Sequence, residues 1–292
     1  MKALFFLRKT TFLKSKIVVG IFLSFALIAC SVQDNNKETR YVVLSPEIAE
    51  IMSYLGVSDK IVGLTAECDY PQEMQNKEKV GNFGQLNLEK IIALNPDLVF
   101  TTALEQNEIS TQLNKMNIET VQLYPSHIDD LIDMIDTLGV ICNVIEKADS
   151  LKTYFLTHIN EFKKIADARE NKPNVFIEIY GDPIMSASND SYLGQLLLLS
   201  GAENIFPSLI RDYARVNSED VVKLNPDVII LTYPGITAQD VKNRKGWTNI
   251  NAVKNNKIYT IDEVNPDLLL RAGPRNIQGI QLLIEIFYGE NN

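Results

Sequence analysis

The chain has 292 residues, and its 28 Lys and Arg against 37 Asp and Glu give it a net charge of −9. An acidic chain of this kind offers no basic stripe for phosphate groups, which excludes nucleic acid as a partner. Hydrophobic residues make up 46% of the sequence, enough to bury two modest cores in a chain of this length.

The first 29 residues have the composition of an export signal. They carry five Lys and Arg and no acid, and the apolar run from Ile17 to Ala29 is too short to span a bilayer comfortably. The run ends in Leu27-Ile28-Ala29-Cys30, which resembles a bacterial lipobox, where the cysteine is lipidated and becomes the mature N-terminus. An uncleaved membrane anchor is the alternative. We predict a signal peptide over 1–29, which leaves a net charge of −14 when it is removed, and a polar tether over 30–39.

Residues 40–127 alternate short apolar runs with helical patterns. Ser45 and Pro46 are expected to open a helix that Gly56 ends, and a second helix is expected from Ile109 to Met116. The predicted strands are 41–44, 61–64, 98–100 and 119–123. This alternation is typical of an α/β lobe with a mainly parallel sheet.

Residues 128–170 carry no strand pattern. One helix is predicted from Asp129 to Leu138, where Gly139 is expected to interrupt it. A nearly unbroken helical stretch then runs from Asn143 to Ala168, and at about 1.5 Å per residue it reaches roughly 39 Å. A helix of that length can run from one lobe to another.

Residues 171–292 return to the alternating pattern. A strand from Val175 to Ile179 and a helix around Leu193 to Leu199 come first. The strands 228–231 and 258–260 and a terminal helix from Arg275 to Tyr288 follow. The fold class predicted for the whole chain is therefore α/β, with two lobes of mainly parallel sheet joined by one long α-helix.

A repeated segment supports the two-lobe interpretation. The 13 residues from Asn87 to Val99 return at 217–229, with six identities and four exchanges of one branched apolar residue for another. Asn87 and Asn217 are each expected to cap a helix, which the proline of Leu-Asn-Pro-Asp stops before a buried strand. An offset of 130 residues is too long for a solenoid repeat and indicates two similar lobes.

Cysteine and histidine are scarce, which bears on metal sites and catalysis. Cys68 and Cys142 are in a disulfide-permissive compartment, but their separation in sequence leaves open whether they pair. The two histidines, His127 and His158, lie in or beside the connecting helices, and the sequence has no Cys/His cluster with zinc spacing. We predict no metal site, no cofactor and no catalytic residues.

Two α/β lobes joined by one long helix, with an export signal and a lipobox, resemble the substrate-binding lipoproteins of ABC importers. More narrowly, the chain resembles the subclass that serves cobalamin, iron-siderophores and haem, over residues 40–288. The Asp-Tyr-Pro loop and the later Arg-Ala-x-Pro-Arg segment look most like those of the cobalamin-binding members. The resemblance rests on these segments: Leu44-Ser45-Pro46, Cys68-Asp69-Tyr70-Pro71, the two Asn-x-Glu repeats, 201–206, and Arg271-Ala272-Gly273-Pro274-Arg275.

The repeat places an aromatic residue at the same loop position of each lobe. Phe83 lies four residues before Asn87, and Tyr213 lies four residues before Asn217. Two such rings can hold a flat macrocycle by stacking, although each can equally plug the base of its own loop. The resemblance favours the ligand role, since cobalamin binders have an aromatic residue at both positions.

Further ligand contacts follow from the same resemblance. Asp267 and Arg271 have the spacing of a surface ion pair on a helix, but the matching residues of cobalamin-binding relatives contact corrin side chains. Met185 and Tyr70 are additional candidates, and either can instead be a core residue. Glu67 and Thr102 stand where those relatives place further aromatic residues, so the ligand is held by fewer rings or is a different large chelate.

Glu89 and Glu219 carry the predicted interaction with the permease. Each sits in the first turn of a repeat helix, where the positive end of the helix dipole stabilises a carboxylate. This stabilisation alone is the alternative to a docking role. The resemblance implies that each docks on one of two matching basic pockets of an ABC permease, which works with its ATPase subunits.

The expected function is the capture of a cobalamin-type corrinoid in the cleft between the lobes and its delivery to an ABC importer. The protein is expected at the outer face of the cytoplasmic membrane, on the periplasmic side in a two-membrane bacterium. Ferric siderophore or haem is the alternative ligand. A chelatase-like enzyme acting on tetrapyrroles and a surface receptor or structural lipoprotein are the alternatives of other classes.

Overall fold

The computed structural model describes residues 38–102 and 106–289. The predicted signal peptide, Cys30 and most of the tether lie outside the described residues, and Thr39 onward belongs to one compact unit. Within the described ranges, none of the helices is both long and apolar enough to cross a membrane. We call the described residues of 40–127 the N-terminal half and the described residues from 171 the C-terminal half.

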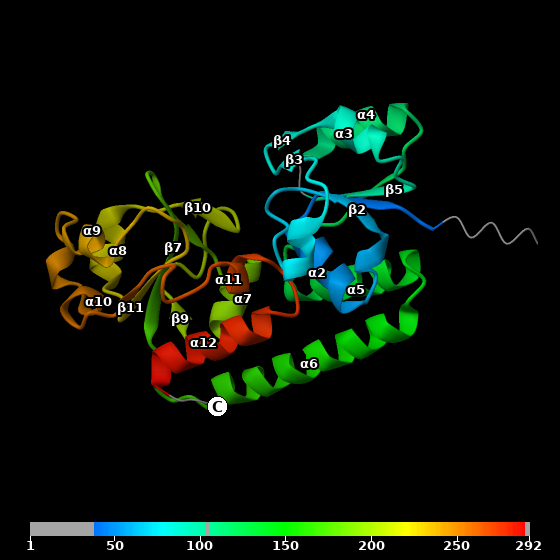
Figure 1. The fold of residues 1–292 in the computed structure, drawn as a ribbon. Coiled ribbons are helices and arrows are strands. Elements are labelled where there is room, and N and C mark those ends of the chain that lie inside the picture. Colours follow the sequence, from blue (N-terminus) through cyan, green and yellow to red (C-terminus); the bar gives the residue numbers. More distant parts are fainter. Residues whose placement is uncertain (1–37, 103–105, 290–292) are drawn as a thin grey trace, which may run out of the picture. The chain divides into compact units, whose positions relative to one another are not determined.

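The N-terminal half is built on a parallel sheet of four strands in the order β2-β1-β5-β6 (Figure 1). Val42, Leu44 and Val99 face Ile91 and Leu113 of the helices on one side. The opposite face packs against the helices of the main core. The elements are β1 (Tyr41–Val43), α2 (Pro46–Tyr54), η1 (Ser58–Lys60), β2 (Ile61–Leu64), η2 (Gln72–Asn76), β3 (Gly81–Asn82), β4 (Gln85–Leu86), α3 (Leu88–Ala93), β5 (Leu98–Thr101), α4 (Asn107–Lys115) and β6 (Thr120–Gln122).

Two helices, α5 (Ile128–Ile141) and α6 (Ile145–Asp167), connect the halves. The expectation that Gly139 interrupts the first of them is wrong. Gly139 lies inside α5, at a close approach to α6 that requires a glycine, since a Cβ on residue 139 would lie 2.4 Å from the Ala148 Cβ. The 23 residues of α6 span about 35 Å. This helix packs against α5 and against α7 and α12 of the C-terminal half, as predicted for the connecting helix (Figure 1).

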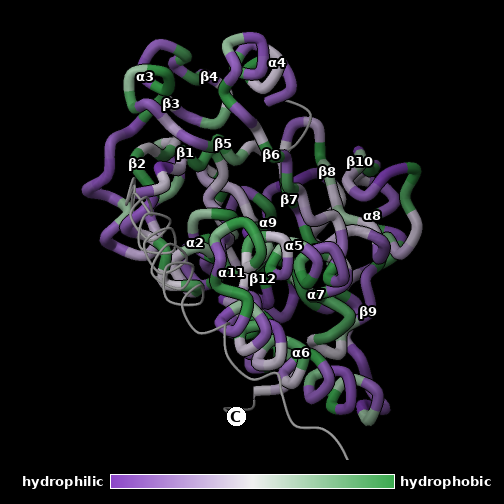
Figure 2. The backbone as a smooth tube through the Cα atoms, turned by 90° about the vertical axis from the view of Figure 1, so that its right-hand side faces the viewer, coloured by the Kyte–Doolittle hydropathy of each residue, from purple (hydrophilic) through white to green (hydrophobic). Residues whose placement is uncertain are grey.

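One stripe of α6 is buried, which fits its position along both halves. Leu151, Phe155 and Phe162 point into the core, while Tyr154 and Thr157 are exposed. Figure 2, which views this helix nearly end-on, shows both hydrophobic and hydrophilic residues in its turns. The apolar pattern in the sequence predicts this orientation correctly.

The C-terminal half holds a second sheet, in the order β10-β8-β7-β11-β12, with β9 paired to β7. Strands β9 and β11 run parallel to β7, and β12 runs parallel to β11. Strand β8 is antiparallel to both β7 and β10. The sequence analysis missed β8, β9 and β10 of this sheet, which are only four, two and three residues long. The strands are β7 (Asn174–Gly181), β8 (Ile184–Ala187), β9 (Glu203–Asn204), β10 (Tyr213–Arg215), β11 (Val228–Leu231) and β12 (Ile258–Tyr259).

Helices cover both faces of this sheet. Phe176, Ile229 and Leu231 pack with Val221 and Trp247 on one face. The alternate residues of the same strands join the main core on the other face, with α7 and α12. The helices are α7 (Tyr192–Leu199), α8 (Ser218–Leu224), α9 (Ala238–Lys242), η4 (Trp247–Asn249), α10 (Asn251–Lys254), α11 (Asp267–Leu270) and α12 (Asn276–Tyr288).

The repeated segment folds as helix, turn and buried strand in both halves, as α3 with β5 and as α8 with β11. Both helices are followed by an asparagine in the left-handed region, Asn95 with φ 46° and Asn225 with φ 48°, directly before the proline. Asn87 caps its helix by accepting a hydrogen bond from the Lys90 amide at 2.9 Å. The predicted cap at Asn217 is wrong, because its side-chain amide donates to Asp220 Oδ2 at 3.2 Å instead.

The two cysteines that the structure describes are both free and buried. Cys68 follows β2, and its thiol lies 3.3 Å from the Thr65 hydroxyl. Cys142 ends α5. Burial raises the pKa of the Cys68 thiol to about 11, so the group is protonated and unreactive at neutral pH.

Candidate ligand-binding site and docking residues

Phe83 sits on the turn of the β3–β4 hairpin, with 38% of its surface exposed. Both carboxylate oxygens of Glu67 accept a hydrogen bond from the Phe83 amide, at 3.0 and 3.1 Å. Asn82 Oδ1 accepts from the Gln85 amide at 2.8 Å and closes the turn. Glu67 is therefore positioned to hold the loop that presents the Phe83 ring.

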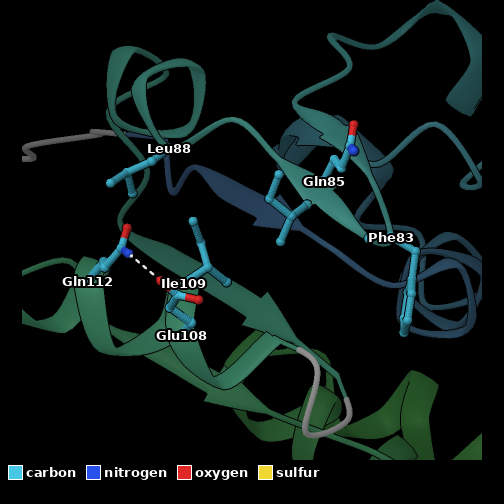
Figure 3. Close-up of a pocket in the computed structure, with 8 residues that line it drawn as sticks. Phe83, Gln85, Leu88, Glu108, Ile109 and Gln112 are labelled. Atoms are coloured by element: carbon cyan, nitrogen blue, oxygen red, sulfur yellow. Dashed lines mark hydrogen bonds between the residues drawn. The ribbon is translucent and has the colours of Figure 1, made fainter.

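A hollow of about 370 Å³ opens beside this hairpin. Figure 3 shows Phe83 on one side of it and the α4 residues Ile109 and Gln112 on another, with Gln112 donating to Glu108 at 3.2 Å. The residues around the hollow all belong to the N-terminal half. It can accommodate part of a bulky ligand at the Phe83 end.

Tyr213 begins β10 and is held differently from Phe83. The side chain is only partly exposed and packs against the main core. The pKa of Tyr213 is raised to about 12, mainly by burial. A hydrogen bond from the Leu193 amide opposes this rise, and the neighbouring Tyr124 adds to it. Tyr124 follows β6 in the N-terminal half, so aromatic residues of both halves lie close together here.

Arg271 contacts three carboxylates, two of which lie in the other half of the molecule. Its guanidinium donates to Asp69 at 2.8 Å and to Glu50 at 3.2 Å, both in the N-terminal half, and lies 3.1 Å from Asp267. Burial lowers the pKa of Arg271, but the Asp69 hydrogen bond and the charges of Asp267 and Asp69 raise it overall. The predicted ion pair between Asp267 and Arg271 is present, as part of a larger bridge and not as an isolated surface pair.

Glu50 is the buried centre of this bridge. It lies on α2, where the surrounding residues are apolar, and its side chain is only 3% exposed. Arg275 donates to Glu50 Oε2 at 2.7 Å through Nε, and its second nitrogen contacts Oε1. The sequence analysis assigned no site role to Glu50 or Arg275. A lone acid within the apolar run of residues 48–52 was the available signal for Glu50.

Tyr70 covers the same bridge. Its ring lies 3.9 Å from the Arg275 guanidinium in a cation–π contact, and 37% of the residue is exposed. Tyr70 and Asp69 therefore place the predicted Asp-Tyr-Pro loop directly against the Arg271–Arg275 segment.

Thr102 and Met185 occupy more enclosed positions. Thr102 is buried, with its hydroxyl donating to Glu47 Oε1 at 3.1 Å and its amide donating to Gln106 at 2.9 Å. Met185 is half-buried on β8, paired with Tyr180 on one side and Arg215 on the other. Thr102 is tied into its own half by these bonds, whereas Met185 keeps a partly open surface.

A second buried ion pair lies within the C-terminal half alone. Glu178 on β7 is fully buried, and its carboxylate accepts two hydrogen bonds from the Arg244 guanidinium, at 2.5 and 2.6 Å. Tyr233 also donates to Glu178, and Arg244 lies over the Trp247 ring at 4.6 Å. This cluster stabilises one half, whereas the Glu50 cluster bridges both.

Glu89 and Glu219 occupy the first turns of α3 and α8 and are both exposed. Over the residues that the structure describes, neither carboxylate forms an ion pair. Both are therefore available to a partner from outside the chain.

The histidines lie away from these clusters. His127 precedes α5 and contacts Asp130 at 3.1 Å, and His158 Nδ1 lies 2.9 Å from the Tyr154 carbonyl on α6. Among the residues described, no three His, Cys, Asp or Glu side chains gather in a way that can hold a metal ion.

Two α/β halves bridged by helices and by an arginine–carboxylate cluster define the class of two-lobed binding proteins. The model of the periplasmic binding protein family matches residues 42–264. The chain belongs to this family and is a substrate-binding protein of the ABC importers.

Individual relatives cover nearly the whole chain. An uncharacterised ABC transporter substrate-binding lipoprotein of Bacillus subtilis is 33% identical over 260 residues, covering 86% of this chain and 81% of the relative. A vitamin B12-binding protein of Vibrio parahaemolyticus is 27% identical over 262 residues, covering 87% and 90%. A possible iron-binding, periplasmic solute-binding protein of Staphylococcus epidermidis has a similar structure, with a TM-score of 0.75, 27% identity and coverage of 85% and 98%.

Proposed function

We propose that this substrate-binding protein captures a cobalamin-type corrinoid between its two halves and delivers it to an ABC permease. The observation that carries the ligand choice is the similarity to a vitamin B12-binding protein over 87% of the chain. The proposal divides the chain into lobes at 40–127 and 171–292, with 128–170 as the connection.

The proposed ligand site draws on both halves. Phe83 and Tyr213 supply rings for the faces of the macrocycle, and Met185 and Tyr70 supply further partly open apolar surface. Asp267 and Arg271 supply an acceptor and a donor for the polar groups at the corrin edge. Glu67 acts through the Phe83 loop, and Thr102 lies behind the site.

The proposed delivery step depends on the two exposed glutamates. Glu89 and Glu219 each dock on a basic pocket of a permease that presents the same pocket twice, with its ATPase subunits behind it. Cys30 is proposed to carry lipid that anchors the protein at the outer face of the cytoplasmic membrane. The name of the Bacillus relative as a lipoprotein supports this anchor.

Calorimetric titration of the full-length chain in detergent tests the ligand. We expect cyanocobalamin to bind at micromolar or lower concentration, with one ligand per chain, and haemin and a ferric siderophore to bind more weakly. The absence of corrinoid binding would refute the choice of ligand. Tight binding of the siderophore would favour the second candidate, which the similarity to a possible iron-binding protein supports.

A further inference from the structure

Glu50, Asp69, Asp267, Arg271 and Arg275 form the bridge between the halves, and their side chains are not equally open to solvent. The side chains of Asp69 and Asp267 are 51% and 33% exposed, whereas those of Arg271, Arg275 and Glu50 are 14%, 7% and 3% exposed. A ligand that approaches the bridge therefore meets carboxylate oxygens first. Those oxygens accept hydrogen bonds and cannot donate them.

Both guanidinium groups of the bridge are engaged by its own carboxylates. Arg271 contacts three carboxylates, and Arg275 donates to both oxygens of Glu50 beneath the Tyr70 ring. A carboxylate on a ligand would compete with Asp69 and Asp267 for Arg271, and Glu50 would still offset the arginine charge.

Charge in this region points in the same direction. Three carboxylates face two guanidinium groups in the bridge itself, which leaves an excess of one negative charge. Nearby, Glu47 and Glu67 add two carboxylates, while Lys79 adds one ammonium group that donates to the Cys68 carbonyl at 2.7 Å. An anionic ligand edge is repelled here, because like charges at the edge of a low-dielectric interior repel one another strongly.

We propose, on the basis of the function proposed above, that this bridge selects ligands by the chemistry of their edge. Ligands with primary amide side chains are accepted, since each amide supplies two N–H donors to Asp69 and Asp267. Chelates whose edge carries carboxylates are rejected. Asp69 is the main selectivity residue, and Glu50 is the positioning residue that keeps Arg271 in place behind it.

Two corrinoids that differ in edge chemistry test this inference. Dicyanocobinamide carries amide side chains, and the dicyano form of cobyrinic acid carries carboxylic acids on the same ring, with the nucleotide loop absent from both. We expect the full-length chain in detergent at pH 7 to bind the amide form at least about tenfold more tightly. Asp69→Asn should reduce this ratio about tenfold by raising the affinity for the carboxylate form.

A matched control removes the same charge elsewhere. Asp59→Asn changes an exposed aspartate in η1, away from the bridge, and should leave the ratio within about twofold of the unmodified chain. Equal binding of the two corrinoids, or an unchanged ratio in Asp69→Asn, would overturn the inference alone. Failure of both corrinoids to bind the unmodified chain would instead overturn the proposed function, and the inference with it.

Discussion

The two halves of the molecule present their equivalent aromatic residues in different ways. Phe83 projects from an exposed hairpin turn that Glu67 holds by its backbone, whereas Tyr213 lies in a sheet strand and packs against the main core. The difference arises because the C-terminal sheet continues into β8 and β10, while the N-terminal half has only the separate β3–β4 pair at this point. The repeat conserves helix, turn and strand but not the support of the loop before them.

The largest expected effect tests whether both halves dock on the permease through their exposed glutamates. Replacing Glu89 and Glu219 together by Lys should reduce ligand uptake in cells to background, because each exposed carboxylate is proposed to pair with a basic pocket. Ligand affinity, measured by calorimetry, should stay within about twofold. Loss of affinity, or full transport by the double variant, would contradict the docking role.

The two buried ion pairs test whether the bridge differs from a pair within one half. Glu50→Gln and Glu178→Gln should each lower the free energy of unfolding by about 3 kcal/mol in urea titrations, since each leaves a buried guanidinium uncompensated. Only Glu50→Gln should also weaken corrinoid binding, by about tenfold, because Arg271 loses its support. Equal effects of both variants on binding would show that the bridge has no special part in the site.

Alanine substitution of the aromatic pair tests how differently the rings are held. Tyr213→Ala should lower the free energy of unfolding by about 2 kcal/mol, and Phe83→Ala by less than about 0.5 kcal/mol, because only Tyr213 packs into the core. Both variants should weaken corrinoid binding. A stability loss at Phe83 as large as that at Tyr213 would contradict the contrast between hairpin and strand.

Alkaline pH should separate the same two residues. The folded pKa of Tyr213 is raised from 10.0 to about 12 mainly by burial, so its contribution to stability is complete below pH 10 and is lost as the pH rises toward 12. Tyr213→Phe should remove this part of the loss, as measured by the difference in unfolding free energy between pH 9 and pH 11. Phe83→Tyr adds an ionisable ring at the exposed position and should leave this pH-dependent loss of unfolding free energy unchanged.

The smallest expected effect concerns the helix caps. Asn87→Ala should lower the free energy of unfolding by about 1 kcal/mol, because the Asn87 side chain accepts the Lys90 amide. Asn217→Ala should change it by only a few tenths of a kcal/mol, since this side chain does not cap α8. Equal losses in thermal or urea unfolding would mean that the repeat caps both helices alike.

Local patterns in the sequence were sufficient to predict most of the architecture. The helix–turn–strand repeat, the long α6 and the buried strands follow from apolar periodicity and from Asn-Pro stops, which act within a few residues. Two details were missed: Gly139 serves the close approach of α6 and does not end a helix, and the Asn217 side chain bonds to Asp220, where the first copy has Lys90.

The candidate site follows the same division. The spacing of Asp267 and Arg271 allowed an ion pair as the alternative to ligand contact, and the structure places the two side chains 3.1 Å apart. Their link to Glu50 joins residues more than 200 positions apart, which single-sequence periodicity cannot indicate. The raised pKa of Tyr213 likewise depends on burial against α7 and on Tyr124 of the other half.

A crystal structure of the full-length chain with bound cyanocobalamin tests the central proposal most directly. We expect the corrin ring to lie between the Phe83 and Tyr213 side chains, with its amides hydrogen-bonded to Asp69 and Asp267 and the Glu50–Arg275 pair intact. A corrinoid bound elsewhere, or one that contacts only one half of the molecule, would contradict it.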